Sequence, residues 1–302
     1  MKTVLDIHGL SKSFTKQAIL QDLRLTIREG DIYGLIGKNG AGKTTLIKII
    51  TQLLFADKGT VSLFSSKTEN EWTKSLSRVG SVIESPVAHN HLTAYQNLKY
   101  YCMIRHIPNA DQVIRETLDY VGLSDTGKKV FRDFSLGMKQ RLGIAIALLS
   151  KPDFLILDEP INGLDPIGIK EFRVMIQRLN QEKGITILIS SHILSELYLV
   201  ANRFGILDQG KIIREISKAE FETLSEDYIV LKTADQEKAC QVLKEQIQLQ
   251  FKVVNPENEI HIFGQEQDVK QILKDLTLAD VAIDEIYYAR QNLEEYFTQL
   301  VE

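Results

Sequence analysis

A glycine-rich octapeptide limits the folds open to this chain more than any other segment. It reads Gly37-Lys38-Asn39-Gly40-Ala41-Gly42-Lys43-Thr44 and matches the pattern G-x-x-x-x-G-K-[ST]. Glycines let the backbone turn so that successive N–H groups converge on phosphate oxygens. A short apolar run at 32–36 precedes the loop and a helical pattern at 45–54 follows it. This strand–loop–helix order predicts an α/β protein that binds the phosphates of a nucleotide.

Two side chains of the loop are expected to act on the bound nucleotide. Lys43 is expected to reach the β- and γ-phosphates, and the Thr44 hydroxyl is expected to ligate Mg²⁺. The helix that begins near Lys43 adds the partial positive charge of its N-terminus. The predicted nucleotide-binding residues of this segment are Gly37, Lys38, Asn39, Gly40, Ala41, Gly42, Lys43, Thr44 and Thr45.

Two carboxylates follow an apolar run at 154–157, which has the pattern of a buried strand. Asp158 is placed to hold Mg²⁺ through water, and Glu159 is placed to polarise an attacking water. Taken alone, a solvated acidic turn at the end of a strand would explain the pair better. The phosphate-binding loop in the same chain favours the catalytic interpretation.

Two further polar residues admit two interpretations each. His192 follows the apolar run 185–189, so it lies at the sheet edge where α/β proteins bind ligands, but an isolated histidine there is more often a capping or surface residue. Ser135 precedes a long apolar helix and suits an N-cap. The same position also aims a hydroxyl and a helix dipole at an anion, and both interpretations stay open.

The first 222 residues have the pattern of an α/β protein. The runs 154–157 and 185–189 are continuously apolar, as in central strands of a covered parallel sheet, with a helical pattern at 168–182 between them. The segments 3–8 and 23–27 alternate apolar and polar residues, which indicates half-exposed strands. Residues 93–150 are mostly helical in pattern.

The pattern changes after about residue 222, where we place a domain boundary. The order there is β-α-β-β-α-β, the ferredoxin-like arrangement. The expected strands are 228–232, 251–254, 259–263 and 281–287, and the expected helical faces lie at 239–247 and 269–276. A last helix is expected with Leu293, Tyr296, Phe297 and Leu300 on one face.

Composition limits the partners. The net charge of −4 gives no overall attraction to nucleic acid or acidic membranes. Charged residues interrupt the N-terminus, and no run of about 18 apolar residues occurs, so we expect neither a signal peptide nor a membrane span. The two cysteines and six histidines show no metal-ligand spacing. The chain is expected to be cytoplasmic and to reach a membrane only through a partner.

Together these segments resemble the ATP-binding subunits of ABC transporters over about residues 3–215. The order of the segments carries the resemblance: the phosphate loop, a signature before a helix, the acidic strand and the strand that ends in a histidine. The family signature reads L-S-G-G-Q; the stretch 134–138 matches it in Ser135 and Gly137 only, and Gln140-Arg141 follow as in the family.

The resemblance implies a fold and a division of the chain. The fold is α/β, a P-loop NTPase of the ABC type with a RecA-like core, an N-terminal antiparallel β region and a helical subdomain at about 90–150. Residues 1–222 would form the ATP-binding domain, and 223–302 a small α+β accessory domain. An accessory segment of this kind can also be a regulatory module that binds an effector, contacts the permease or helps dimerisation.

The resemblance also implies roles for single residues, with ATP and Mg²⁺ as ligands. Phe14 resembles the aromatic that stacks on adenine, Glu159 the general base and His192 the switch histidine that contacts the γ-phosphate. The signature faces the nucleotide of a second subunit in a head-to-tail dimer. Asp165, in the segment 162–165, resembles the residue that crosses the same interface.

One departure from the family pattern is specific. Where the family has glutamine, this chain has Glu84, and this glutamate resembles the subgroup of bacitracin- and lantibiotic-resistance exporters. Glutamate keeps the length of glutamine but adds a charge and removes an amide donor. Glu84 is therefore expected to join Thr44 and Asp158 as a Mg²⁺ ligand.

The function implied is ATP hydrolysis that drives a separate permease, with export of an antimicrobial peptide or a similar amphipathic compound. The subunit would lie on the inner face of the cell membrane, dimerise with itself or a close paralogue, and bind no nucleic acid. Tyr95, Leu98, Tyr101 and Met103 either contribute to the permease contact or belong to the core of the helical subdomain. The alternative is a soluble ABC-type ATPase that acts on nucleic acid or ribosomes.

Overall fold

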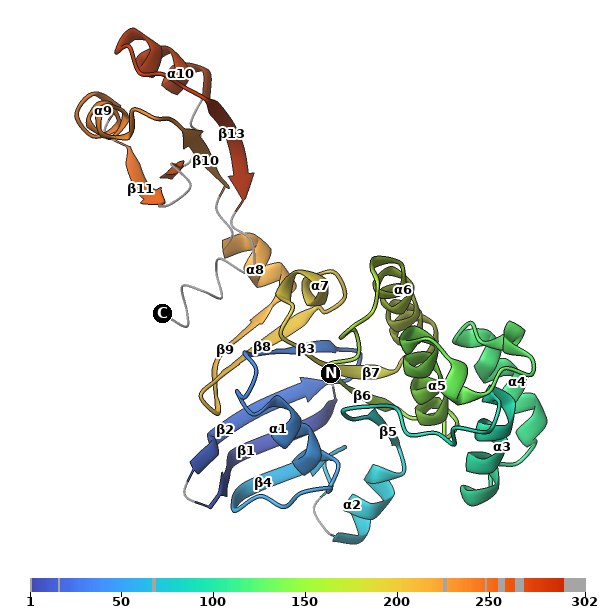
Figure 1. Ribbon diagram of the computed structural model, residues 1–302. Coiled ribbons are helices and arrows are strands. Elements are labelled where there is room, and N and C mark those ends of the chain that lie inside the picture. Colours follow the sequence, from blue (N-terminus) through green and yellow to red (C-terminus); the bar gives the residue numbers. More distant parts are fainter. Residues whose placement is uncertain are drawn as a thin grey trace. The chain divides into compact units, whose positions relative to one another are not determined.

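The computed structural model describes residues 2–15, 17–66, 69–224, 227–247, 249–254, 259–263 and 269–290. It divides into two compact units, Met1–Lys218 and Ala219–Glu302 (Figure 1). The first unit contains a six-stranded and a three-stranded sheet, and the second contains a four-stranded sheet.

The six-stranded sheet is the centre of the first unit. Its strands pair in parallel except for the last, which is antiparallel to its neighbour. Their order is β5 (Val79–Val82), β6 (Phe154–Asp158), β7 (Thr186–Ser191), β3 (Ile32–Ile36), β8 (Arg203–Asp208) and β9 (Lys211–Ser217). Every residue of β3, β6 and β7 is buried, which explains their continuous apolar runs. The carboxyl ends of these three neighbouring strands meet at one edge of the sheet.

Helices that connect the parallel strands have clear end signals. α1 (Lys43–Ile50) follows β3, and α6 (Pro166–Lys183) joins β6 to β7. Asp165 caps the N-terminus of α6, proline occupies its first turn, and Gly184 ends it at φ 67°. The short helices α7 (Leu194–Tyr198) and α8 (Lys218–Leu224) follow β7 and β9.

The N-terminal antiparallel sheet has the order β2 (Gln17–Arg28), β1 (Thr3–Phe14) and β4 (Lys58–Leu63), and α2 (Glu69–Leu76) follows it. One face of this sheet supplies buried residues such as Leu5, Ile7 and Leu25 to the core that also contains Leu46 and Ile47 of α1. The alternation predicted for 3–8 and 23–27 is therefore confirmed, although both strands are longer than predicted.

The predicted helical segment contains three helices, α3 (Ala94–Ile104), α4 (Ala110–Tyr120) and α5 (Leu136–Leu148). Short 3-10 turns lie at Ser124–Thr126 and Phe131–Asp133. The entry into α3 is fixed by a reciprocal capping box between Thr93 and Gln96. The predicted RecA-like core, antiparallel β region and helical subdomain are all confirmed.

The second unit has the predicted ferredoxin-like order. Its strands are β10 (Asp227–Lys232), β11 (Gln250–Val254), β12 (Glu259–Phe263) and β13 (Glu285–Arg290), and its helices are α9 (Gln236–Val242), a π-turn at Leu243–Ile247 and α10 (Val269–Leu278). All pairs are antiparallel, in the order β11-β12-β10-β13. One sheet face, with Ile229, Leu231, Ile260 and Ile262, shares a core with helix residues such as Leu276 of α10.

Two further predicted boundaries are wrong. The strand predicted at 281–287 begins only at Glu285, which pairs with Lys232. Val281 is buried in the core, and the Ala282 carbonyl accepts a hydrogen bond from the Thr233 hydroxyl, so this stretch packs as a loop. The helix predicted at 45–54 is α1, which begins earlier because the phosphate loop ends in its first turn. The helix predicted around 293–300 lies outside the described residues.

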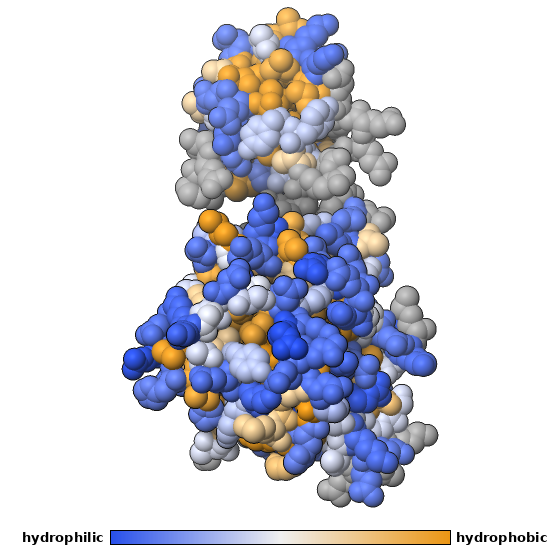
Figure 2. Space-filling view, turned by 90° about the vertical axis from the view of Figure 1, so that its right-hand side faces the viewer, coloured by the Kyte–Doolittle hydropathy of each residue, from blue (hydrophilic) through white to orange (hydrophobic). Residues whose placement is uncertain are grey.

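Within the ranges that the structure describes, each helix is too short or too polar to span a lipid bilayer. Hydrophilic residues cover most of the larger body in Figure 2, and apolar residues appear there in small separate groups.

Truncation of the central strand is expected to destabilise the first unit. Ile156 of β6 is fully buried, so Ile156→Ala should lower the free energy of unfolding by about 2–5 kcal/mol. Ile213→Ala on β9, where the side chain is 40% exposed, should change it by less than about 0.5 kcal/mol. Urea denaturation followed by circular dichroism measures both, and equal losses would contradict this assignment of the core.

Candidate functional site

The phosphate loop connects β3 to α1 at the carboxyl edge of the central sheet (Figure 1). Gly42 has φ 111°, and a Cβ added there would lie 2.8 Å from Leu20 Cδ2. A Cβ added to Gly37 would lie 2.6 Å from the Leu207 carbonyl oxygen. Glycine is therefore required at both positions, once for conformation and once for close packing.

Lys43 is a buried cation at the start of α1. Its side chain is 6% exposed, and Nζ donates to the carbonyl oxygens of Gly37 at 2.7 Å and Lys38 at 3.2 Å. The N-cap of this helix, Gly42, supplies no side-chain acceptor to the first-turn N–H groups. A buried ammonium beside an uncapped helix N-terminus fits a phosphate group.

Asp158 is held by two hydroxyl donors. Thr44 Oγ1 donates to Asp158 Oδ2 at 2.8 Å, and Ser190 Oγ donates to Asp158 Oδ1 at 2.6 Å. Asp158 is 3% exposed; its hydrogen bond from Ser190 is buried, and the one from Thr44 is partly buried. The Thr44 hydroxyl and the Asp158 carboxylate are hard oxygen ligands at one point, and this donor set fits Mg²⁺.

Glu159 joins the loop to the predicted histidine. Its Oε1 lies 3.0 Å from Lys43 Nζ, and its Oε2 lies 2.9 Å from His192 Nδ1. The residue has φ 47°, and its N–H donates to Ser190 Oγ at 2.9 Å. A non-glycine residue in the left-handed region costs of order 1–3 kcal/mol and is concentrated at functional sites. The three predicted catalytic residues thus form one cluster within a single chain.

Glu84 lies in a different contact from the one expected. It follows β5 with φ 60°, and its Oε1 lies 2.5 Å from Lys48 Nζ of α1. Of the hydrogen bonds found among the described residues, none joins Glu84 to Thr44 or Asp158. Its role as a Mg²⁺ ligand stays a prediction. Lys48, which pairs with Glu84, and Ser190, which bonds to Asp158, are not among the predicted site residues. The position of Lys48, four residues after Thr44 on one helix face, is a signal that could have identified it.

Phe14 is the last residue of β1. Its side chain is 45% exposed, and the Lys12 ammonium lies 5.6 Å from the ring centroid. An exposed ring is available for stacking on a planar base, and this role stays a prediction.

The residues predicted to face a second subunit cap helices within the chain. Ser135 Oγ accepts from Met138 N at 3.3 Å at the start of α5, and Asp165 Oδ1 accepts from Gly168 N at 2.8 Å at the start of α6. The capping interpretation of Ser135 is therefore confirmed. The two loops are neighbours, because a Cβ added to Gly163 would lie 2.8 Å from Leu136 Cδ2.

The predicted permease-contact residues divide into core and surface. Leu98 is fully buried, so its core interpretation holds, whereas Tyr95 is 38% and Met103 61% exposed. The Tyr95 hydroxyl donates a hydrogen bond to the Asp111 carboxylate. The pKa of Asp111 lies below its usual value, mainly because Lys99 also donates a hydrogen bond to this carboxylate. Tyr101 donates to the Val87 carbonyl at 3.1 Å.

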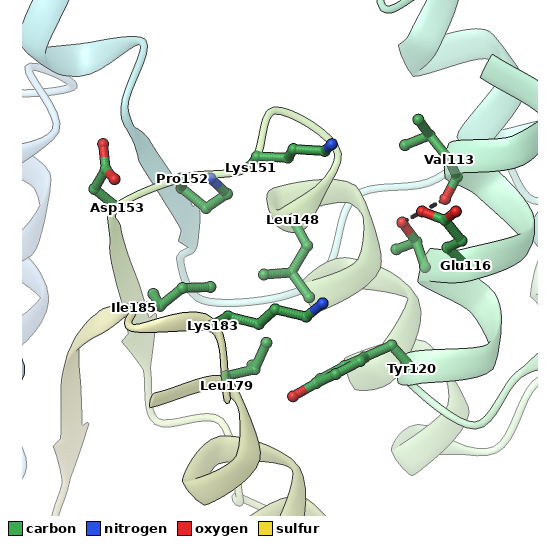
Figure 3. A pocket seen from close by; sticks show the side chains of 11 residues that line it. Val113, Glu116, Tyr120, Leu148, Lys151, Pro152, Asp153, Leu179, Lys183 and Ile185 are labelled. Carbon is green, nitrogen blue, oxygen red and sulfur yellow. Dashed lines mark hydrogen bonds between the residues drawn. The ribbon is translucent and has the colours of Figure 1, made fainter. Parts of the chain in front are cut away.

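A separate hollow of about 350 Å³ contains none of the predicted site residues (Figure 3). Lys151 and Lys183 project into it from one side, and Tyr120 faces them from α4. Pro152 and Ile185 in its lining precede β6 and β7, so the hollow lies at the amino ends of these strands. The phosphate loop and its carboxylates lie at the opposite edge.

Comparison with known proteins identifies relatives of one kind. The family model described as ABC transporter matches residues 20–162. A bacitracin transport ATP-binding protein of Enterococcus faecalis is 38% identical, over 100% of this chain and 97% of its own length. A lantibiotic transport ATP-binding protein of Streptococcus pyogenes is 44% identical, over 74% of this chain and 95% of its own length.

A solved structure described as the ATP-binding subunit of an ABC transporter agrees with these relatives. It is 29% identical, has a TM-score of 0.64, and covers 73% of this chain and 92% of its own. Its likeness extends over most of the chain, as expected for a shared ATP-binding domain.

Proposed function

Since this chain belongs to the ABC transporter family and is one of its ATP-binding, ATP-hydrolysing subunits, we propose that it drives the export of an antimicrobial peptide or a similar amphipathic compound through a separate permease. One observation carries the export proposal. The likeness to the bacitracin transport protein extends through the whole chain, including the second unit, which lies beyond the residues that the family model matches. Both of these relatives are transport ATP-binding proteins, so the ribosomal or nucleic-acid alternative receives no support.

The proposed chemistry begins with an exchange of partners at Lys43. Its ammonium is held by Glu159 Oε1 and by the Gly37 carbonyl oxygen. Phosphate oxygens of ATP compete for the same ammonium, so nucleotide binding frees the Glu159 carboxylate. The freed carboxylate accepts a proton from the attacking water. His192, in contact with the other carboxylate oxygen, orients Glu159 and approaches the γ-phosphate.

Mg²⁺, held by Thr44 and Asp158 with Glu84 as a further candidate, would neutralise charge on the phosphates. Ser190 orients the Asp158 carboxylate by donating to Oδ1. Phe14 stacks on the adenine, and the loop from Gly37 to Thr45 surrounds the phosphates. The hydrogen bonds of Thr44 and Ser190 to Asp158 support the proposed Mg²⁺ site.

The partners proposed are a second ATP-binding subunit and a permease. Ser135, Gly137 and Asp165 are offered to the nucleotide of the second subunit in a head-to-tail dimer. Residues 1–222 act as the ATP-binding domain, and 223–302 as an accessory domain that contacts a partner or an effector. The subunit binds at the inner face of the cell membrane through the permease.

A mixing experiment tests the head-to-tail dimer. Gly137 lies in the first turn of α5, where aspartate is compatible with the helix dipole but would repel a phosphate. Lys43→Ala and Gly137→Asp chains are each expected to be inactive. An equimolar mixture should regain about a quarter of the wild-type ATPase activity, since half of the dimers contain one intact composite site. No recovery, with dimers present by light scattering, would contradict the shared site.

Reconstitution tests the export proposal. The chain, produced with the membrane protein encoded beside it, should co-purify with that protein and raise the tolerance of a sensitive host to bacitracin or a lantibiotic. Glu159→Gln should abolish the tolerance without loss of co-purification. Dependence on an extracellular binding protein would indicate import, and association with ribosomes without a membrane protein would support the alternative class.

A further inference from the structure

The ion pair between Lys48 and Glu84 has no place in the chemistry described above. Their Nζ and Oε1 atoms are 2.5 Å apart, although the two residues are 36 positions apart in the chain. Glu84 is also the residue at which this chain departs from the family glutamine. Glu84 therefore forms an ion pair with Lys48, which an uncharged glutamine at this position could not form.

Lys48 is placed by α1 near the candidate metal ligands. It lies four residues after Thr44 on the same helix, so both residues occupy one helix face, about 6 Å apart along the axis. Thr44 bonds to Asp158. A carboxylate bound to Lys48 is thus held alongside α1, on the helix face that also carries Thr44.

The backbone around Glu84 is fixed on both sides. Val82 ends β5, and Pro86 packs so closely on α5 that a Cβ added to Gly143 would lie 2.8 Å from Pro86 Cβ. Between these anchors Glu84 has φ 60°, a conformation that costs non-glycine residues energy. The Glu84 side chain is 63% exposed, so packing does not enclose its carboxylate.

We propose that Lys48 is a positioning residue that competes with a divalent cation for the Glu84 carboxylate. While the ion pair is formed, it keeps the Glu84 carboxylate from Thr44 and Asp158 and offsets the charge of that carboxylate near the site for phosphates. When nucleotide and cation bind, the carboxylate leaves Lys48. This proposal rests on the proposed function, because it assumes that the phosphate loop binds ATP with a divalent cation.

The test measures nucleotide affinity rather than turnover. A fluorescent, non-hydrolysable ATP analogue is titrated into the full chain with Mg²⁺ and with EDTA, and the ratio of the two affinities reports the cation contribution. Lys48→Met removes the competitor and should raise this ratio about two- to fivefold, the range of an exposed ion pair. Glu84→Gln should lower it.

The double variant decides whether Lys48 acts through Glu84. Lys48→Met in the Glu84→Gln background should leave the ratio where Glu84→Gln alone puts it. Lys48→Arg, which keeps the charge and the pairing, should retain the wild-type ratio. Lys238→Met removes the lysine of a comparable exposed ion pair with Asp280 in the second unit and serves as the matched control.

Two results would overturn the proposal. One is a Lys48→Met ratio equal to that of wild type and Lys238→Met. The other is an equal rise in both backgrounds, which would show a general charge effect rather than competition for Glu84. Failure of the wild-type chain to bind the analogue in either buffer would instead remove the proposed nucleotide site itself.

Discussion

Glu159→Gln is expected to lower kcat for ATP hydrolysis by about 100-fold or more, the range of a lost general base. The amide keeps the shape of the carboxylate but does not accept the proton of the attacking water. Binding of ATP should persist, because Lys43 loses only a competitor 3.0 Å away and keeps its bonds to Gly37 and Lys38. A chain that binds without turnover should accumulate in the closed dimer, in which a second subunit completes the site.

Steady-state ATPase assays and size-exclusion chromatography with ATP measure the two effects. Glu182→Gln is a matched control, since Glu182 is half exposed and pairs with Arg178 on the surface of α6. Its kcat should equal that of the wild type. Wild-type turnover in Glu159→Gln would refute the assignment of Glu159 as the general base.

Lys43→Ala is expected to weaken ATP binding and to lower kcat/KM by about 100-fold or more, as for loss of a charged donor at a reacting group. The ammonium is buried at the start of α1, and no other lysine or arginine contacts the Glu159 carboxylate among the described residues. Removal of Lys43 leaves the Glu159 carboxylate in contact with His192 alone. The negative charge of this carboxylate then repels the phosphates of ATP.

Isothermal titration with ATP and Mg²⁺ separates binding from turnover. Lys151→Ala is the control: this lysine is exposed in the hollow at the amino ends of the strands and should leave both quantities unchanged. Circular dichroism shows whether the loop variant folds. Unchanged ATP affinity in a folded Lys43→Ala chain would contradict the assignment of the phosphate loop.

The fold was predictable where a local pattern reports burial. The apolar runs of β6 and β7 and the alternation in β1 and β2 gave the correct element types. The βαββαβ order of the second unit was also correct. The strand predicted at 281–287 failed because Val281 is apolar for a different reason: it packs on the helices from a loop, and pairing starts at Glu285.

The sequence predicted the single residues of the candidate site but not which of their side chains contact each other. Side chains at the ends of parallel strands were expected to share one sheet edge. That Glu159 would contact Lys43 and His192 at once depends on β6, β7 and β3 being consecutive neighbours in the sheet. Ser190, which holds Asp158 and the Glu159 N–H, gave no signal because a serine at a strand end has many structural uses.

The phosphate loop, the acidic strand, the family and the unusual Glu84 can be recognised without a structure, because each is a short pattern of residue types at fixed spacing. Which side chains meet depends on how the chain folds. Thr44 and Asp158 are 114 positions apart, and Lys48 and Glu84 are 36 apart. Such contacts are fixed by strand order and by the packing of α1 and α5, and neither leaves a periodic trace in the chain. The glycine loop therefore predicted a phosphate site, and the fold brought the Lys43 ammonium to 3.0 Å from the Glu159 carboxylate.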